Sequence, residues 1–340
     1  MLSAGMPAEP VDPTGAASVP GAGIVAARFA HWRTAENARV FDALARHFAH
    51  LAEHPVLPLH FEYALTSNDR GRAAAERLSR HLPPRRRGPF RRRPRVLDVG
   101  SAYGGFLVAF AERGARVTGI ERDERYVRLA VANLSEKGLD AELVLGDAAD
   151  PHPAFRRKFD LILANDVLEH LSRLDPFLAN LREWLAKGGV AYLEIPNGLH
   201  PPFVLRDGHH QLFGITLLEF AEASAYMRQH TPGGSYDTYN YLGPEEYERL
   251  FARHGLSFEI LPETTAGLDP ECVLRWLAEV REGLEAGLRT VPDDSRALVR
   301  ERVEAYLTRA ETAPRADEEE RRRFVLAYGP GFWIALARAR

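Results

Sequence analysis

The sequence predicts an α/β fold with a doubly wound sheet of seven strands, mostly parallel with an antiparallel last strand. From residue 94 onward, short apolar strands alternate with amphipathic helices. This alternation implies right-handed crossovers and a parallel sheet that is covered on both faces. A glycine-rich turn follows the first strand and opens a helix, which is typical of α/β sheets that bind ligands. Helices before the sheet and within a late insertion are expected to add a helical cap.

The composition is that of a globular protein. Of the 340 residues, 45% are hydrophobic and 27% are charged, and the net charge of −3 excludes a polycation that coats nucleic acid. The single cysteine, Cys272, excludes an intrachain disulfide and a cysteine-based zinc cage. No run approaches the ~18 apolar residues of a membrane span, and residues 1–22 lack the basic and apolar regions of a signal peptide. We therefore expect residues 1–22 to form a flexible tail on a cytoplasmic protein.

The N-terminal part, residues 23–93, is predicted to be a helical cap with a basic linker. Apolar residues recur at helical spacing over 34–54, and a second helix is expected over about 67–82, where two prolines stop it. The arginine-rich loop Arg85–Arg93 follows. We interpret this loop as a solvated linker and keep a phosphate-binding patch as the less favoured alternative.

The core is predicted over residues 94–262, completed by a final strand within 324–340. Each of its strands is a short apolar run, and each helix has apolar residues at helical spacing. Glycines 188 and 189 are expected to end the third core helix. The predicted strands are 95–99, 117–121, 141–145, 159–164, 190–195, 256–261 and 332–337, and the predicted helices are 104–113, 124–137, 171–187 and 244–254.

Residues 263–323 form an insertion before the last strand, because a hairpin needs only about 2–5 loop residues. Two helices are predicted there, 270–289 and 295–311, and each has an apolar stripe that needs a partner. The stripes can pack on each other, against the N-terminal helices or across a dimer, and we expect them to pack against the N-terminal helices as a lid over the acceptor. A dimer interface is the second alternative and a structural appendage the third. The charge run 317–323 is interpreted as a solvated helix turn.

The segment from Val96 to Phe106 has the strongest functional signal. Gly100 permits a sharp turn after the strand, and Gly104 lets the start of the helix approach a ligand closely. Asp98, two residues before the first glycine, would repel a pyrophosphate and could face a cationic group. Glu121 ends the next strand, where a carboxylate can accept two hydrogen bonds from a ribose diol.

These residues resemble the class I S-adenosylmethionine-dependent methyltransferases of the small-molecule type. The resemblance covers about residues 94–198, and in the glycine loop Ala102 replaces the family's middle glycine. It implies a Rossmann-like sheet, S-adenosyl-L-methionine as the methyl donor, and methyl transfer to an acceptor. Asp98 is assigned to the methionine side, Glu121 to the ribose and Asp147 to the adenine amino group. The residues assigned to the donor are Asp98, Gly100, Ser101, Ala102, Gly104, Glu121, Arg122, Asp147, Ala148, Asn165 and Asp166.

A small organic acceptor, methylated on oxygen, is the favoured substrate class. Methyl transfer mainly requires alignment and exclusion of water, and histidine is best suited to take a hydroxyl proton near neutral pH. His209 and His210 are the candidate bases, whereas His170 is expected to order the loop near the donor. A metal could be bound if Asp166 and Asp207 met these histidines, but no ligand spacing demands it, and we assign no metal.

Two other function classes stay open. The first is a methyltransferase that acts on RNA or another macromolecule, which only the loop Arg85–Arg93 favours. The Asn/Asp-Pro-Pro-aromatic motif of amino-methylating DNA enzymes is absent after the fourth strand, and no cysteine stands there for methylation of a pyrimidine carbon. The second is a non-catalytic protein that binds S-adenosylmethionine. A nucleic-acid partner is therefore not expected, and a homodimer stays an option.

Overall fold

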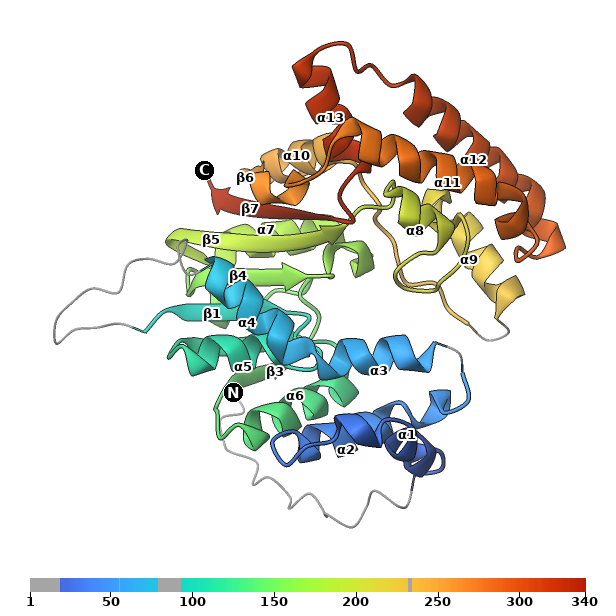
Figure 1. Ribbon diagram of the computed structural model, residues 1–340. Coiled ribbons are helices and arrows are strands. Elements are labelled where there is room, and N and C mark those ends of the chain that lie inside the picture. The colour runs from blue at the N-terminus through green and yellow to red at the C-terminus, as the bar shows by residue number, and fades with distance from the viewer. Residues whose placement is uncertain (1–18, 55, 79–92, 232–233) are drawn as a thin grey trace. The chain divides into compact units, whose positions relative to one another are not determined.

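The computed structural model describes residues 19–54, 56–78, 93–231 and 234–340 (Figure 1). The chain divides into two compact units, residues 1–147 and residues 148–340. Most of the predicted tail and the arginine loop up to residue 92 lie outside the described residues. The end of the predicted tail does not, because residue 22 already begins a helix. The predicted division into cap, core and insertion stays a prediction.

Seven strands form a sheet in the order β3-β2-β1-β4-β5-β7-β6. Strand β2 is parallel to β1 and to β3, β4 is parallel to β5, and β7 is antiparallel to both β5 and β6. This order confirms the predicted doubly wound, mostly parallel sheet with an antiparallel last strand. The strands are β1 Arg95–Val99, β2 Arg116–Glu121, β3 Glu142–Leu145, β4 Phe159–Asn165, β5 Leu185–Pro196, β6 Leu256–Ile260 and β7 Phe332–Ala339.

The N-terminal unit carries more short helices than predicted. The helix expected over 34–54 is shorter and is followed by the 3-10 turn Ala49–Leu51, while α1 and α3 were not predicted. Helix α3 contains a proline in its first turn, where the missing N–H costs no helical hydrogen bond. The helices of this unit are α1 Ala22–Arg28, α2 Ala38–His47, α3 Leu57–Leu65, α4 Ser67–Leu78, α5 Gly105–Glu112 and α6 Glu124–Glu136.

Helix α4 packs closely on α5, the helix that follows the glycine turn. A Cβ on Gly105 would come within 2.3 Å of the backbone oxygen of Ser67, and one on Gly71 within 2.4 Å of the backbone oxygen of Gly105. Both positions therefore need glycine. Asn133 of α6 donates a hydrogen bond to the backbone oxygen of Tyr103 at 2.8 Å. The turn before α5 is thus held from two sides by packing inside its own unit.

The C-terminal unit contains the remaining helices. The helix predicted over 171–187 begins at Leu174 and ends at Trp184, before the glycines expected to stop it, because Leu185 already pairs with Phe159 of β4. The helices are α7 Leu174–Trp184, α8 Pro201–Leu205, α9 Phe220–His230, α10 Pro244–Arg253, α11 Pro270–Leu288, α12 Asp293–Thr312 and α13 Glu318–Tyr328. The 3-10 turns of this unit are Pro153–Phe155, Leu168–His170, Ile215–Leu217 and Pro262–Thr265.

The apolar stripes of the insertion are buried within the C-terminal unit. Val280 of α11 and Val299 of α12 are fully buried in one cluster that also holds Phe213 and Tyr226. Both stripes thus pack on each other and on the segment around α8 and α9, while packing against the N-terminal helices stays a prediction. A role of the insertion as a lid stays a prediction.

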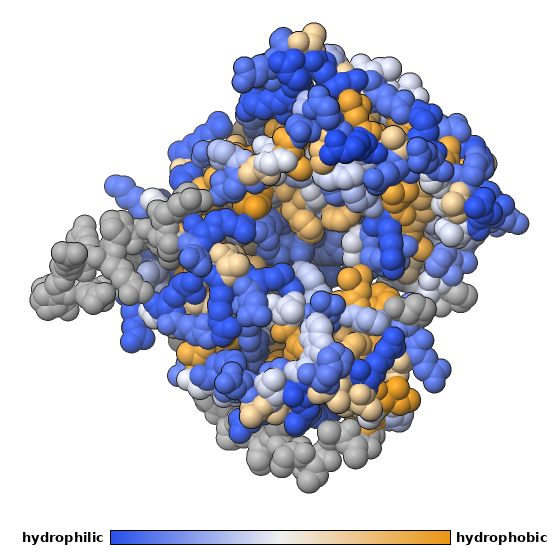
Figure 2. Space-filling view, viewed as in Figure 1, coloured by the Kyte–Doolittle hydropathy of each residue, from blue (hydrophilic) through white to orange (hydrophobic). Residues whose placement is uncertain are grey.

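The start of α13 is polar and exposed. The charge run 317–323 caps and opens α13 and is mostly exposed, in line with the predicted solvated turn. Figure 2 shows a largely hydrophilic surface over α13, at the top of the view. Among the described helices, none combines the length and the hydropathy that crossing a membrane would require.

Candidate functional site

The turn between β1 and α5 has the backbone conformation that its glycines predict. Gly100 and Gly104 have φ angles of 65° and 76°, which lie in the left-handed region that glycine adopts without steric cost. The N–H of Gly100 donates to the carbonyl of Ile120 in β2 at 2.9 Å, and Ser101 is buried below the turn. Ala102, at the position of the family's middle glycine, has a φ of 40°, which is unfavourable for alanine.

Glu121, at the end of β2, is fixed by this turn. Its carboxylate accepts hydrogen bonds from the backbone N–H of Ala102 at 3.1 Å and of Asp123 at 3.0 Å. Each oxygen therefore has one protein donor and keeps acceptor capacity for another, since an ionised carboxylate offers about four lone-pair sites. The arrangement leaves Glu121 oriented and able to accept hydrogen bonds from a ribose diol.

Asp98 is buried in β1 beside Glu121, with a relative exposure of 3%. Its Oδ2 atom has no hydrogen-bond partner among the described residues. Burial, and secondarily the Glu121 charge, raise the pKa of Asp98 to about 8. A buried carboxyl group with one oxygen that lacks a hydrogen-bond partner fits a site for a cationic ligand group, which would supply a charge and the missing hydrogen bond.

The other predicted donor residues divide between the two units. Arg122 is exposed next to Glu121, and Asp147 is half-buried after β3; both belong to the N-terminal unit. In the C-terminal unit, Ala148 is buried, and Asn165 donates a hydrogen bond to the carboxylate of Asp166 at 3.1 Å. Asp166 has a φ of 53° and follows β4 directly. The structure thus brings Asp98, Ala102 and Glu121 together in one unit, and Asn165 and Asp166 in the other.

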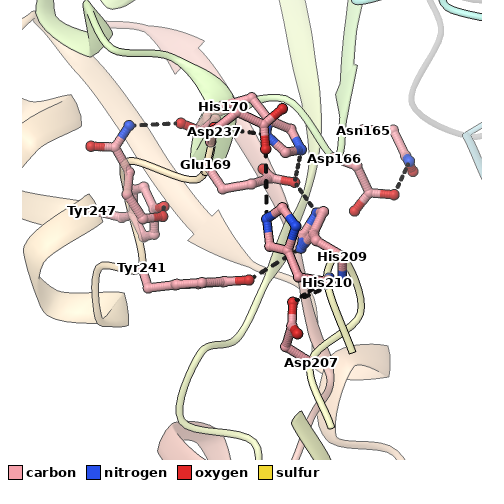
Figure 3. A network of polar contacts seen from close by, with 12 residues as sticks. Asn165, Asp166, Glu169, His170, Asp207, His209, His210, Asp237, Tyr241 and Tyr247 are labelled. Carbon is pink, nitrogen blue, oxygen red and sulfur yellow. Dashed lines mark hydrogen bonds and ion pairs between the residues drawn. The ribbon is translucent and has the colours of Figure 1, made fainter. Parts of the chain in front are cut away.

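A cluster of histidines and carboxylates lies in the C-terminal unit (Figure 3). The carboxylate of Glu169, which is fully buried, lies between the rings of His170 and His209. The Nε2 atoms of these histidines are 3.7 Å and 3.6 Å from Oε1 of Glu169. One ligand atom from each of the three residues lies within 4.8 Å of the others, so the group could hold a metal ion. We call Glu169, His170 and His209 the histidine cluster.

The opposite ring nitrogens of the histidine cluster are anchored by a second layer. Nδ1 of His170 contacts the backbone oxygen of Asp237 at 3.0 Å, and Nδ1 of His209 contacts the hydroxyl of Tyr241 at 3.2 Å. The Nδ2 group of Asn240 donates to the carbonyls flanking the cluster, Leu168 at 2.9 Å and Leu171 at 2.7 Å. The segment 237–241 therefore orients both rings, and its hydrogen bonds hold the turn that carries Glu169.

The carboxylate of Asp207 accepts backbone hydrogen bonds and is therefore not available to a ligand. Its carboxylate accepts hydrogen bonds from the N–H groups of His209 and His210, each at 2.9 Å, and of Leu212 at 2.8 Å. Such a carboxylate fixes the local turn, which sets the direction of both histidines. We considered a metal site made of Asp207, Asp166 and the two histidines His209 and His210. In the structure it is Glu169 that two histidine rings face, those of His170 and His209.

The two candidate bases differ in their electrostatics. Burial opposes the charged form of His209, but the Glu169 carboxylate outweighs it and raises the pKa of His209 to about 9. Burial lowers the pKa of His210, and its Nε2 atom has no hydrogen-bond partner among the described residues. The carboxylate of Asp237 lies 3.7 Å from that Nε2 atom. The Nε2 atoms of both histidines thus face a carboxylate without a hydrogen bond, but the one near His209 is buried and the one near His210 is exposed.

Sequence reasoning missed Glu169 and its second layer. Glu169 stands in the segment that resembles the family after the fourth strand, but no role was given to it. An adjacent Glu-His pair at the carboxyl end of a parallel strand was the available signal, because ligand sites of such sheets lie there. Nothing comparable marks Tyr241, which meets His209 only through the fold.

Comparisons with known proteins identify the family of this chain. Residues 67–259 match the family model described as a methyltransferase domain, which is more than half of the chain. Over 174 residues the chain is 28% identical to a ubiquinone biosynthesis O-methyltransferase of Azoarcus sp. (strain BH72), covering 50% of this chain and 67% of that protein. The protein of the same name from Caulobacter vibrioides is 27% identical over 165 residues, 46% of this chain and 57% of that protein.

Among solved structures, phosphoethanolamine N-methyltransferase 2 of Haemonchus contortus, in complex with S-adenosyl-L-methionine, is similar with 17% identity and a TM-score of 0.40. That match covers 80% of this chain and 52% of the other. The glycine turn, the paired carboxylates of β1 and β2 and the family match over residues 67–259 agree with one another. The chain belongs to the class I S-adenosylmethionine-dependent methyltransferases, and its methyl donor is S-adenosyl-L-methionine.

Proposed function

We propose that this protein transfers the methyl group of S-adenosyl-L-methionine to an oxygen atom of a small organic acceptor. The observation that carries the proposal is the arrangement of Asp98 and Glu121 at the glycine turn, which suits a cationic amino acid and a ribose. The curated relatives are named O-methyltransferases, which supports oxygen as the methylated atom.

We assign the donor contacts as the sequence predicted them. Asp98 binds the methionine side, Glu121 accepts hydrogen bonds from the ribose hydroxyls, and Asp147 faces the adenine amino group. The sulfonium donor is already activated, so the protein's work is alignment, exclusion of water and removal of one proton. These tasks need no covalent intermediate on the protein.

The acceptor proton is assigned to His210. Its Nε2 atom makes no hydrogen bond and faces only the exposed carboxylate of Asp237, whereas the ring of His209 lies between the buried Glu169 and Tyr241. In the proposed step the acceptor hydroxyl gives its proton to His210 while its oxygen attacks the methyl carbon. The carbon–sulfur bond breaks, its electron pair stays on sulfur, and S-adenosylhomocysteine leaves.

The donor site is tested by calorimetric titration of S-adenosyl-L-methionine into Glu121→Ala. We expect a loss of about 1–3 kcal/mol in binding free energy, because a charge-assisted pair of hydrogen bonds disappears. Glu124→Ala is the matched control, since Glu124 lies three residues on in α6 and pairs with Arg128 at the surface. Unchanged affinity in the Glu121 variant would remove this residue from the site.

The acceptor class is tested by incubating the purified protein and isotope-labelled donor with a metabolite extract. Label should appear in a small molecule, on oxygen. Label in RNA would replace the proposal with a macromolecule methyltransferase. Tight donor binding without transfer to either pool would leave a non-catalytic binding protein.

A further inference from the structure

The histidine cluster has a feature that an ordinary buried ion pair lacks. Glu169 is fully buried, and neither of its carboxylate oxygens has a hydrogen-bond partner among the described residues. Leaving such a group without hydrogen bonds is costly, because burial removes the water that would otherwise donate to it. Two histidine Nε2 atoms face one of these oxygens from 3.6 Å and 3.7 Å.

These distances are too long for hydrogen bonds, whose N–H···O separation is about 2.7–3.2 Å. They are close to the spacing of atoms that share a metal ion. Metal bonds of about 2.0–2.2 Å place neighbouring ligand atoms roughly 3–3.5 Å apart. A shift of a few tenths of an ångström in the side chains would bring Glu169, His170 and His209 onto one ion.

The same unit contains a histidine–carboxylate pair of the ordinary kind. Nε2 of His254 lies 2.7 Å from the carboxylate of Asp175, which is a normal charge-assisted hydrogen bond. Asp175 is exposed, whereas Glu169 is buried. The longer contacts of Glu169 therefore do not follow from pairing a histidine with a carboxylate; they reflect two rings placed around one buried group.

The second layer has the form that metal-binding histidines take. Such a histidine binds through one ring nitrogen and gives the other to a backbone oxygen or another polar group, which fixes its tautomer and orientation. His170 does this with the carbonyl of Asp237 and His209 with the hydroxyl of Tyr241. The Nε2 atoms of both rings are left to face Glu169 (Figure 3).

We propose that Glu169, His170 and His209 bind a divalent transition-metal ion. Two imidazoles and one carboxylate suit Zn²⁺ and its first-row neighbours better than Ca²⁺ or Mg²⁺, which prefer oxygen ligands alone. Three protein ligands leave at least one coordination position open, as in catalytic sites.

The open position gives the ion a role in the reaction; this part rests on the proposed function. An acceptor hydroxyl bound there would lose its proton more readily, because a divalent cation lowers the pKa of an oxygen that it binds. The proton goes to His210, next to His209 in the chain. Methyl transfer would then depend on the ion, while donor binding would not.

Metal binding itself is tested without donor or acceptor. The full chain is stripped with a chelator and titrated with Zn²⁺, and separately with Co²⁺, whose visible absorption reports coordination by nitrogen ligands. We expect one ion per chain, a rise in melting temperature on binding, and a Co²⁺ spectrum that Glu169→Gln and His209→Asn abolish. Tyr241→Phe removes only the second-layer contact of His209 and should weaken affinity by about 10–100-fold.

His254→Asn is the matched control, because it removes a histidine–carboxylate pair of the same unit and should leave metal affinity unchanged. Circular dichroism of the metal-free variants shows whether each one folds, and His170→Asn provides a further ligand variant if Glu169→Gln does not. Failure of the folded wild-type chain to bind either ion, or equal affinity in a folded ligand variant, would overturn the proposal. Metal binding without methyl transfer would instead contradict the proposed function.

Discussion

The glycine turn and the histidine cluster hold their carboxylates in opposite ways. At the turn, Glu121 receives backbone N–H groups from residues 2 and 19 positions away in the chain. In the cluster, Glu169 has no hydrogen-bond donor to its carboxylate among the described residues, and its turn is clipped by Asn240, 69–72 positions away from the carbonyls it binds. The first carboxylate has hydrogen bonds before a ligand arrives, whereas the second faces two histidine rings without a hydrogen bond.

This difference between the two carboxylates indicates that the glycine turn and the histidine cluster have different roles. A carboxylate that is oriented by its own loop can recognise a ligand with little rearrangement, which suits the donor that every turnover uses. A buried carboxylate without hydrogen bonds is a cost that a fold keeps where function needs it. We therefore expect changes at the turn to alter donor affinity, and changes around the cluster to alter turnover.

The largest expected effect is on turnover in His210→Ala. Loss of the proton acceptor should reduce the rate about 100-fold or more while donor affinity stays unchanged, because general-base catalysis contributes roughly 10²–10⁴-fold. Steady-state kinetics with a turned-over acceptor, together with donor calorimetry, measure both quantities. His230→Ala, an exposed histidine in the same unit, is the control and should behave as wild type. A full rate in the His210 variant would move the base elsewhere.

The hydrogen bonds that Asn240 donates to the turn of the histidine cluster are tested with Asn240→Ala. This change removes two hydrogen bonds to the turn 168–171, at about 0.5–1.5 kcal/mol each, and should lower the free energy of unfolding by about 1–3 kcal/mol. Turnover should fall further than stability alone explains, since Glu169 and His170 lose their support. Chemical denaturation and kinetics at a temperature where the variant is folded separate the two effects. If donor affinity fell instead, the glycine turn and the histidine cluster would not have the separate roles that we infer.

The turn was predictable from sequence, and the cluster only in part, for the same physical reason. A tight turn that needs glycine, followed by a helix, leaves a local pattern, so Asp98 and Gly100 could be singled out within residues 96–106. Glu169 meets residues 239 and 240 only because the turn after β4 and the segment after α9 fold together, and no local pattern encodes that contact. The stripes of α11 and α12 were likewise visible, but their partner near α8 was not, since an apolar stripe does not specify its partner.

The raised pKa of Asp98 predicts that both stability and donor affinity depend on pH. Its pKa is raised to about 8, above the ~3.9 of an unfolded aspartate, so its contribution to stability is lost as pH rises from about 4 towards 8. Binding of a cationic group favours the ionised form, and donor affinity should therefore rise by up to about tenfold per pH unit below 8. In Asp98→Asn both the stability and the donor affinity should depend less on pH. Melting temperatures and calorimetry over this pH range measure the two quantities. A donor affinity of wild-type protein that is independent of pH would contradict this.

The smallest expected effect is at Ala102, where the turn departs from the family's pattern. A φ of 40° costs alanine about 1–2 kcal/mol, and glycine avoids that cost but loses about 0.5–1 kcal/mol of backbone entropy on folding. Ala102→Gly should therefore stabilise the protein by about 0.5–1 kcal/mol. Donor affinity should not change, because the hydrogen bond to Glu121 comes from the backbone N–H of residue 102. Ala109→Gly, a buried position within α5, should destabilise instead, and a lower melting temperature in both variants would show that the turn is not strained.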